Sequence, residues 1–261
     1  MEQKLFIQNR KNEKIAVIVD RTDDQRGLVF VMHGLGGFKE QPHILAIAQA
    51  FKEKGFTAIR FDTTNTLGES DGSYEKATIT NYYEDLEDVV AWAAAQEWYQ
   101  EPFVLAGHSL GGICTALFAE RHTEKVLAIA PISTVVSGEL LVEAEKKEYP
   151  DWFAEWERTG WSEDESRSKP GVIKRLPWSH IVDRLKYDLL PEAKKLTMPV
   201  LLVVGEEDTT TPPADVQTLY DALPGSKELH VILGARHTFR DEAHLKEIKE
   251  LILVWIDKLP K

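Results

Sequence analysis

The stretch Phe103–Phe118, FVLAGHSLGGICTALF, decides the fold. It begins with an apolar run typical of a buried strand, places Ser109 between glycines and continues as an apolar helix. Residues 107–111 match G-x-S-x-G, in which a strand turns sharply into a helix and exposes the serine oxygen at the turn. Glycines flank the serine because a side chain there would collide with neighbouring backbone. The alternative, a solvated helix-capping serine, is disfavoured by the strand before the motif and the helix after it.

Apolar, β-branched runs like the one before Ser109 recur along the chain. They predict strands at 16–19, 28–32, 57–61, 103–106, 126–130, 200–204 and 229–233, and helical patterns occur at 42–54, 79–97, 110–121, 213–223 and 241–259. This alternation predicts an α/β fold with a mostly parallel sheet covered on both faces, in one domain with an insertion rather than two small domains. In such sheets functional residues gather at the carboxyl ends of the strands.

Residues 134–190 break the alternation. They contain many charges and no clear strand, although ELLVEAEKKE can form an amphipathic helix. The segment also holds four of the seven tryptophans: Trp152, Trp156, Trp161 and Trp178. We interpret it as an insertion packed on the core.

Composition excludes several kinds of partner. The 261 residues carry a net charge of −12, so no basic surface is expected for nucleic acid. No apolar run approaches the length of a membrane span, and the first residues, MEQKLFIQNRKNEK, lack the apolar segment of a secretory signal. Cys114, the single cysteine, rules out an intrachain disulfide and fits a reducing compartment. A cytoplasmic location is therefore expected.

A serine nucleophile needs a base to remove its proton and a third group to orient that base. His237, in LGARHTF, follows the final predicted strand, and Asp208, in VLLVVGEEDTTTPP, follows the strand at 200–204. The order Ser109, Asp208, His237 is the one expected on this fold. Glu206 and Glu207 compete with Asp208, but the shorter acid at the end of the loop fits better.

Acyl transfer also requires donors for the negative charge that develops on the carbonyl oxygen. The N–H of Leu110, at the start of the helix after Ser109, is one candidate. The loop HGLGGFKE, after the strand at 28–32, offers the N–H of Leu35 as the second. We expect His33 to anchor this loop by hydrogen bonds and His108 to pack beside the turn.

Together these motifs resemble the α/β-hydrolase superfamily, and more narrowly its serine-aminopeptidase-like branch, which includes monoglyceride lipases and bacterial feruloyl or cinnamoyl esterases. The resemblance is carried by HGLGG, RFDTTNTLGESDG, GHSLGG, GEEDTTTPP and GARHTF. It implies an eight-stranded, mostly parallel sheet with an antiparallel edge formed by the first strands. It also implies a core of residues 1–133 and 191–261, with residues 134–190 forming a cap, or lid.

The resemblance further implies a serine hydrolase that cleaves small carboxylic esters through an acyl-enzyme, with feruloyl or cinnamoyl esters among the possible substrates. Ser109 would attack, His237 would transfer the proton, Asp208 would orient His237, and Leu35 and Leu110 would form the oxyanion hole. No cofactor or metal is implied. The alternatives are an aminopeptidase, a thioesterase or a C–C bond hydrolase on the same residues, or a receptor that senses a small ligand through its cap.

Substrate-binding residues are left open by the sequence. The cap tryptophans, with Phe153, either line a pocket or form the core of the cap, and packing is favoured for most of them. Glu69 and Asp71, in GESDG, either border the pocket or lie in a solvated turn, which is favoured. The oligomeric state is also open, with a homodimer as one alternative.

Overall fold

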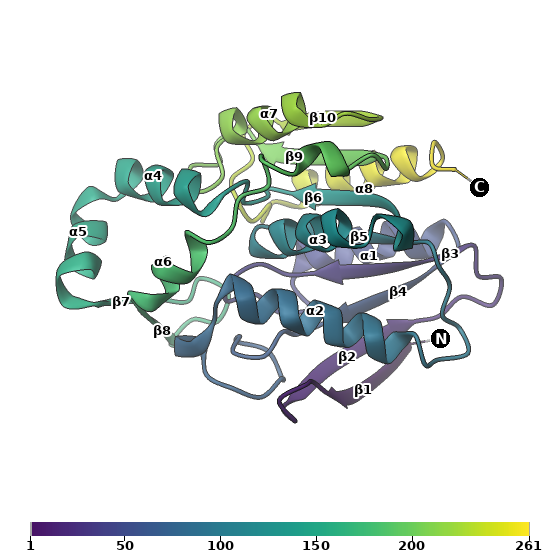
Figure 1. Cartoon of the computed structure of the whole chain (residues 1–261), viewed down its shortest axis with the longest axis horizontal. Coiled ribbons are helices and arrows are strands. Elements are labelled where there is room, and N and C mark those ends of the chain that lie inside the picture. The colour runs from purple at the N-terminus through teal and green to yellow at the C-terminus, as the bar shows by residue number, and fades with distance from the viewer. Residues whose placement is uncertain (1, 261) are drawn as a thin grey trace.

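In a computed structural model, which describes residues 2–260, eight strands form one sheet in the order β1-β2-β4-β3-β5-β6-β9-β10 (Figure 1). The strands are β1 (Glu2–Gln8), β2 (Lys14–Asp20), β3 (Gly27–Met32), β4 (Phe56–Phe61), β5 (Phe103–His108), β6 (Val126–Ile132), β9 (Val200–Gly205) and β10 (Lys227–Ile232). β2 is antiparallel to both β1 and β4, and the remaining neighbours are parallel. The eight-stranded, mostly parallel sheet expected from the sequence is confirmed.

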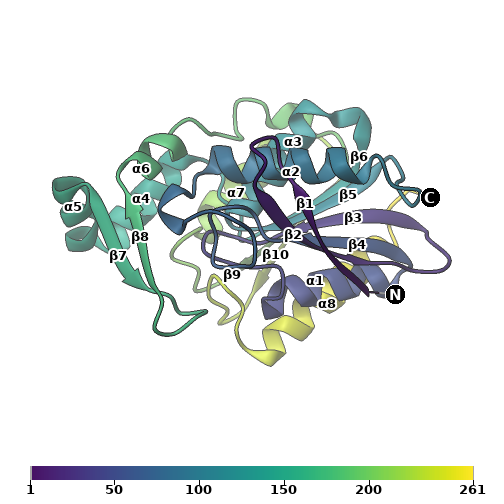
Figure 2. The same ribbon diagram turned by 90° about the horizontal axis from the view of Figure 1, so that it is seen from below.

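Helices cover both faces of this sheet. α1 (Pro42–Glu53) and α8 (Glu242–Ile256) pack on one face, and α2 (Ile79–Ala93), α3 (Leu110–Arg121) and α7 (Pro213–Ala222) pack on the other (Figure 2). Successive side chains of a strand therefore enter different cores: Phe30 packs with α2 and α3, whereas Val29 and Val31 pack with α1. None of the helices within residues 2–260 combines the length and apolar character needed to cross a membrane.

Between β6 and β9 the chain leaves the sheet. It forms α4 (Gly138–Glu148), α5 (Pro150–Thr159), the antiparallel hairpin β7 (Trp161–Glu165) and β8 (Ile173–Pro177), and α6 (Ser179–Arg184). In Figure 1 these elements lie beyond the carboxyl ends of the parallel strands. Ser137 and Asp188 pair in a β-bridge, so the two ends of this insertion meet at its base. The insertion consequently covers the edge where the loops after β3, β5, β9 and β10 converge.

The hairpin corrects one expectation, since no strand was expected in residues 134–190. Its strands, WSEDE and IKRLP, show no apolar alternation because most of their side chains face solvent. Charges pair across it instead: Arg175 lies 2.9 Å from Glu163, and Lys174 lies 3.3 Å from Asp164. Cross-strand pairing of this kind stabilises a hairpin but leaves no hydrophobic period.

Short one-turn 3-10 helices complete the described chain at Tyr74–Lys76, Thr123–Lys125 and Ala193–Lys195. The edge strand β1 was also absent from the predicted strands. It is largely exposed, with Ile7 its one buried residue, and its apolar run is limited to Leu5, Phe6 and Ile7, shorter than the runs by which most of the inner strands were found.

Candidate active site

Ser109 forms the turn that joins β5 to α3. Its backbone has φ 56° and ψ −116°, a strained conformation for a residue with a side chain. The close approach of neighbouring backbone explains the flanking glycines: a Cβ on Gly107 would lie 2.3 Å from the carbonyl oxygen of Gly111, and a Cβ on Gly111 would lie 2.6 Å from that of His33. The Ser109 N–H donates to the Ile132 carbonyl at 3.0 Å, which holds the turn against β6.

The structure brings Ser109, His237 and Asp208 into one chain of contacts. His237 Nε2 lies 2.9 Å from Ser109 Oγ, and His237 Nδ1 lies 2.8 Å from Asp208 Oδ2. An ionised Asp208 only accepts hydrogen bonds, so the Nδ1 proton points to it and Nε2 is left to accept from the serine hydroxyl. This is the tautomer that a general base for Ser109 requires.

Residues of its own loop hold the Asp208 carboxylate in place by hydrogen bonds. Its Oδ1 accepts the N–H groups of Thr210 at 3.0 Å and Thr211 at 2.9 Å, and the Thr211 hydroxyl lies 2.9 Å from Oδ2. Burial raises the pKa of Asp208, but His237 and the hydrogen bonds together bring it below its ordinary value. Glu206 and Glu207 lie elsewhere, with Glu206 accepting from the Gly234 N–H and Glu207 pairing with exposed Arg236.

Two further histidines fix the loops around Ser109. His108 Nε2 lies 2.7 Å from the carbonyl oxygen of His237, and because a carbonyl only accepts, the ring donates. Burial, with His237 nearby, lowers the pKa of His108 to about 3. His33 Nδ1 donates to the Gly34 carbonyl, and its Nε2 accepts the Thr63 N–H. The anchoring expected of His33 is present, whereas the bond from His108 to the His237 loop was not foreseen.

The oxyanion-hole hypothesis concerns the N–H groups of Leu35 and Leu110. Leu110 is the first residue of α3, and Leu35 lies on the wall of the cavity beside Ser109. Among the hydrogen bonds of residues 2–260, none is donated by the N–H of either leucine. Neither N–H group therefore has a protein acceptor among the described residues, and their role as an oxyanion hole stays a prediction.

A cavity of about 430 Å³ opens at Ser109 and His237, between the loop after β3 and the insertion. Trp152 and Trp156 line it, but Trp161 and Trp178 do not. Trp178 packs edge-on against Phe153 and Trp156 inside the insertion, and Trp161 lies under the Arg175 guanidinium. Trp178 therefore packs within the insertion, as we expected of most of these aromatic residues. The alternative role, lining the pocket, is wrong for Trp161 and Trp178 at this cavity.

Glu69 and Asp71 do not reach the cavity either. Glu69 pairs with Lys39, and Asp71 accepts the Lys14 N–H at 2.8 Å.

Several residues of the cavity wall were missed by sequence reasoning. His43, on α1, is buried, and its Nε2 has no hydrogen-bond partner among the described residues. Tyr149 and Arg184 come from the insertion, where Arg184 pairs with Glu145 at 2.7 Å. No motif marks these positions, because the insertion is placed over Ser109 only by tertiary packing.

Comparison with known proteins agrees with this arrangement. Residues 23–244 match the family described as serine aminopeptidase, S33. The chain belongs to this family of α/β hydrolases. The resemblance read from the motifs is thereby confirmed, and the coarse function, hydrolysis, follows from the family.

Two proteins with related sequences match most of the chain. Mouse mitochondrial palmitoyl-protein thioesterase ABHD10 is 28% identical over 245 residues, which cover 89% of this chain and 76% of that protein. An uncharacterized 31.7 kDa Escherichia coli protein from the traX-finO intergenic region is 28% identical over 239 residues, covering 80% and 82%.

Solved structures share the fold of this hydrolase at lower identity. Est1E from Butyrivibrio proteoclasticus, with ferulic acid bound, has a TM-score of 0.79 at 20% identity and covers 98% of both chains. The structure of mouse ABHD10 has a TM-score of 0.79 at 23% identity and covers 98% of this chain and 99% of that one.

Proposed function

We propose that this protein is a serine hydrolase that cleaves small carboxylic esters or thioesters through an acyl-enzyme. The observation that carries the proposal is the unbroken chain of contacts from Asp208 through His237 to Ser109, in the wall of a cavity of about 430 Å³. The cavity volume suits a small-molecule substrate.

In the proposed reaction, Ser109 Oγ attacks the substrate carbonyl carbon while its proton passes to His237 Nε2. The N–H groups of Leu35 and Leu110 donate to the resulting oxyanion. Collapse of this intermediate breaks the bond to the leaving group, which takes the proton from His237. Water then adds to the acyl-enzyme with His237 as base, and the acid is released from Ser109. Asp208 stabilises the imidazolium and keeps its orientation throughout.

A thioester is the second candidate substrate, because the mouse relative at 28% identity over 89% of this chain is named a palmitoyl-protein thioesterase. The bond type decides between the candidates, since both use the same nucleophile and base. Matched butyryl ester, thioester and amide substrates should be compared by kcat/KM. A dominant amide rate would instead support an aminopeptidase.

The first test of the proposal is the nucleophile itself. Purified protein should hydrolyse p-nitrophenyl esters of short and medium acyl chains, and a fluorophosphonate probe should label it at Ser109. Ser109→Ala should abolish labelling and lower kcat by several orders of magnitude. Absence of both turnover and labelling in the wild type would refute the proposal and favour the ligand-receptor alternative.

The proposal also covers the role of residues 134–190 and the location of the protein in the cell. Residues 134–190 would act as a cap over a core of 1–133 and 191–261, with Trp152 and Trp156 facing the substrate. Limited proteolysis with and without an acyl-enzyme inhibitor tests the cap, since a bound inhibitor should protect it. Cell fractionation tests the cytoplasmic location.

A further inference from the structure

The cavity beside Ser109 has a charge opposite to that of the protein. The chain as a whole carries a net charge of −12, yet more basic than acidic side chains line this cavity. The charged residues of the wall are Arg167, Lys174, Arg184, Arg240, Glu145 and Asp164. A cationic cavity in an acidic protein attracts an anionic ligand.

Two of the four cations are neutralised within the wall. Arg184 pairs with Glu145 at 2.7 Å, and Lys174 pairs with Asp164 at 3.3 Å. Neither Arg167 nor Arg240 has a carboxylate partner among the residues that the structure describes. The excess positive charge of the cavity therefore resides on these two arginines.

Arg240 is held in place at the rim. It follows His237 by three residues; its Nε donates to Thr238 Oγ1 at 3.1 Å, and its Nη1 donates to the Arg167 carbonyl at 3.2 Å. The second bond ties the loop between β7 and β8 to the loop that carries His237. The Arg240 guanidinium thus contacts the backbone of Arg167, and both arginines line the cavity although they come from different parts of the chain.

Neutral donors adjoin the two arginines. Gln41 Nε2 donates to Ser168 Oγ at 3.0 Å, which joins the same hairpin loop to the start of α1. The Ser168 hydroxyl hydrogen has no acceptor among the described residues, and Ser168 also lines the cavity. A guanidinium group can donate two parallel hydrogen bonds to a carboxylate or a phosphate, and a neighbouring hydroxyl can donate a further one.

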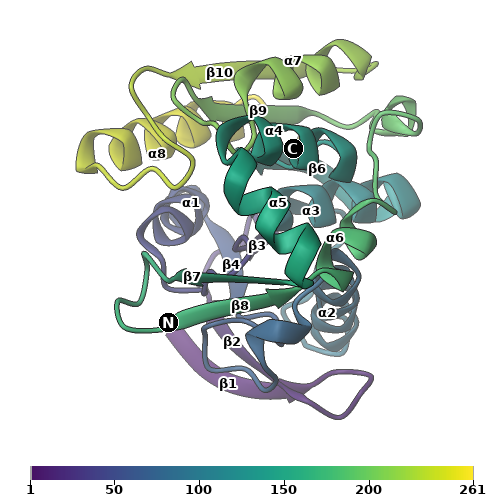
Figure 3. The same cartoon turned by 90° about the vertical axis from the view of Figure 1, so that its left-hand side faces the viewer.

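The opposite end of the cavity is aromatic. Tyr149, Trp152 and Trp156 line it from the start and body of α5. α5 adjoins one end of the β7–β8 hairpin and the loop of Arg167 lies at the other, as Figure 3 shows. A strand of five residues separates the two ends by about 13 Å. The cavity is therefore aromatic at one end, where the paired Arg184 and Glu145 also lie, and carries its unpaired cations at the other.

We propose that the substrate is a carboxylic ester or thioester that also bears an anionic group, a carboxylate or a phosphate, bound by Arg167 and Arg240. Its apolar part lies against Trp152 and Trp156. This inference rests on the proposed hydrolase function, because it concerns the substrate of the same site.

Two matched substrate pairs test the anionic group and identify its source. p-Nitrophenyl valerate and mono-p-nitrophenyl glutarate differ by a carboxylate on the acyl side, whereas S-butyrylpantetheine and S-butyryl-4′-phosphopantetheine differ by a phosphate in the leaving group. The wild type should prefer the anionic member of at least one pair by about tenfold in kcat/KM, the effect expected of two exposed charge contacts. Added salt should reduce this preference.

The variant Arg167→Ala/Arg240→Ala should bring the preferred ratio close to one, mainly through KM of the anionic substrate. Arg236→Ala is the matched control, because Arg236 adjoins His237 in sequence but pairs with Glu207 outside the cavity. It should keep the wild-type ratio. A wild-type ratio near one for both pairs, or a ratio unchanged in the double variant, would overturn the inference while leaving ester hydrolysis intact.

A binding measurement separates this inference from the hydrolase function. If no substrate is turned over, calorimetric titration of the Ser109→Ala protein with mono-p-nitrophenyl glutarate and S-butyryl-4′-phosphopantetheine still tests the site. Affinity for at least one of them should fall about tenfold when Arg167 and Arg240 are replaced in the same background. Equal affinity with and without the arginines overturns the inference.

Discussion

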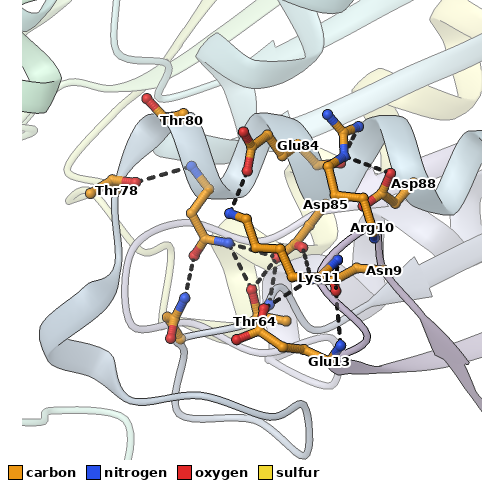
Figure 4. A network of polar contacts seen from close by, with 12 residues as sticks. Asn9, Arg10, Lys11, Glu13, Thr64, Thr78, Thr80, Glu84, Asp85 and Asp88 are labelled. Carbon is orange, nitrogen blue, oxygen red and sulfur yellow. Dashed lines mark hydrogen bonds and ion pairs between the residues drawn. The ribbon is translucent and has the colours of Figure 1, made fainter.

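Two buried aspartates, in different regions of the molecule, have pKa values that the fold shifts in opposite directions. Asp208, at the carboxyl end of β9, is 2% exposed, and Asp85, on α2, is 1% exposed. Each accepts several hydrogen bonds. Asp85 Oδ2 accepts from the Thr64 N–H at 2.6 Å and from its hydroxyl at 2.7 Å, while Asn81 and Asn9 donate their side-chain amides at 3.2 and 3.1 Å (Figure 4).

The pKa values of the two carboxyl groups nevertheless shift in opposite directions. Burial raises the pKa of Asp85 to about 6, because its donors are neutral and only partly offset the lost hydration. Burial acts in the same direction on Asp208, but His237 supplies an ionisable partner, and the pKa falls below 3.8. The difference indicates that hydrogen bonds from neutral donors do not by themselves offset burial at Asp85, whereas at Asp208 the neighbouring His237 and the hydrogen bonds together do.

The largest effect expected from this comparison is on catalysis. Asp208→Asn should lower kcat on p-nitrophenyl butyrate by about 10⁴-fold, because the amide no longer fixes the His237 tautomer. Asp85→Asn is the matched control: it makes the same chemical change at an equally buried site, and its kcat should change far less. Comparable losses in the two variants would remove the distinction between the two regions.

The free energy of unfolding should also depend on pH in opposite ways at Asp85 and Asp208. A raised native pKa means that the folded protein holds the Asp85 proton more tightly than the unfolded chain does. The resulting stability is complete below pH 3.8 and is lost as the pH rises through about 6. Relative to Asp85→Asn, the wild type should therefore lose about 2 kcal/mol of unfolding free energy between pH 4 and 7.

Urea denaturation of both proteins at a series of pH values gives this difference. The constant cost of the asparagine amide cancels, since only the slope with pH is compared. For Asp208 the sign is reversed, because its lowered pKa contributes stability above pH 3.8 that is lost on acidification. Parallel curves for the wild type and Asp85→Asn would contradict the raised pKa.

A smaller effect is expected from the neutral donors around Asp208. The Thr211 hydroxyl lies 2.9 Å from Asp208 Oδ2 and 3.0 Å from the Ser133 carbonyl. Thr211→Val removes it with little change in shape and should lower kcat by about fivefold, as expected for one hydrogen bond of about 1 kcal/mol. A loss of kcat as large as that of Asp208→Asn would show that the Thr211 hydroxyl, rather than His237, keeps the Asp208 carboxylate in its working state.

The sequence predicted the Asp208 region far better than the Asp85 region, for a physical reason. Glycines around Ser109 and loops after apolar strands are local signals, and they led to three residues that lie in hydrogen-bond contact. Asp85 sits in YYEDLEDVV among other acids, and nothing local separates it from Glu84 or Asp88. One signal was available: Asp85 falls on the helix face that also buries Tyr82 and Val89.

Local sequence signals also failed at one helix end and in the insertion. The start of α2 at Ile79 was predicted, and Thr78 caps it by accepting the Asn81 N–H. Its end was predicted four residues beyond Ala93, because AAQE continues the helical pattern while the chain turns there to reach β5. Hairpin β7–β8 and the cavity residues Arg167 and Arg184 depend on contacts distant in sequence, which no local period encodes.

The smallest effect is expected at Lys11, which lies at the surface beside the Asp85 network. Asn9 and Lys11 are two residues apart, and both contact α2: Asn9 donates to Asp85 inside the network, whereas Lys11 pairs with Glu84 at 2.5 Å in solvent (Figure 4). Lys11→Ala should lower the unfolding free energy by no more than about 0.5 kcal/mol, with a salt-sensitive effect, because exposed ion pairs contribute little. Asn9→Ala leaves a buried acceptor short of a donor and should cost about 1–3 kcal/mol. Equal costs in urea denaturation at pH 7 would mean that burial, the property that sets Asp85 apart from its acidic neighbours, does not determine the strength of these contacts.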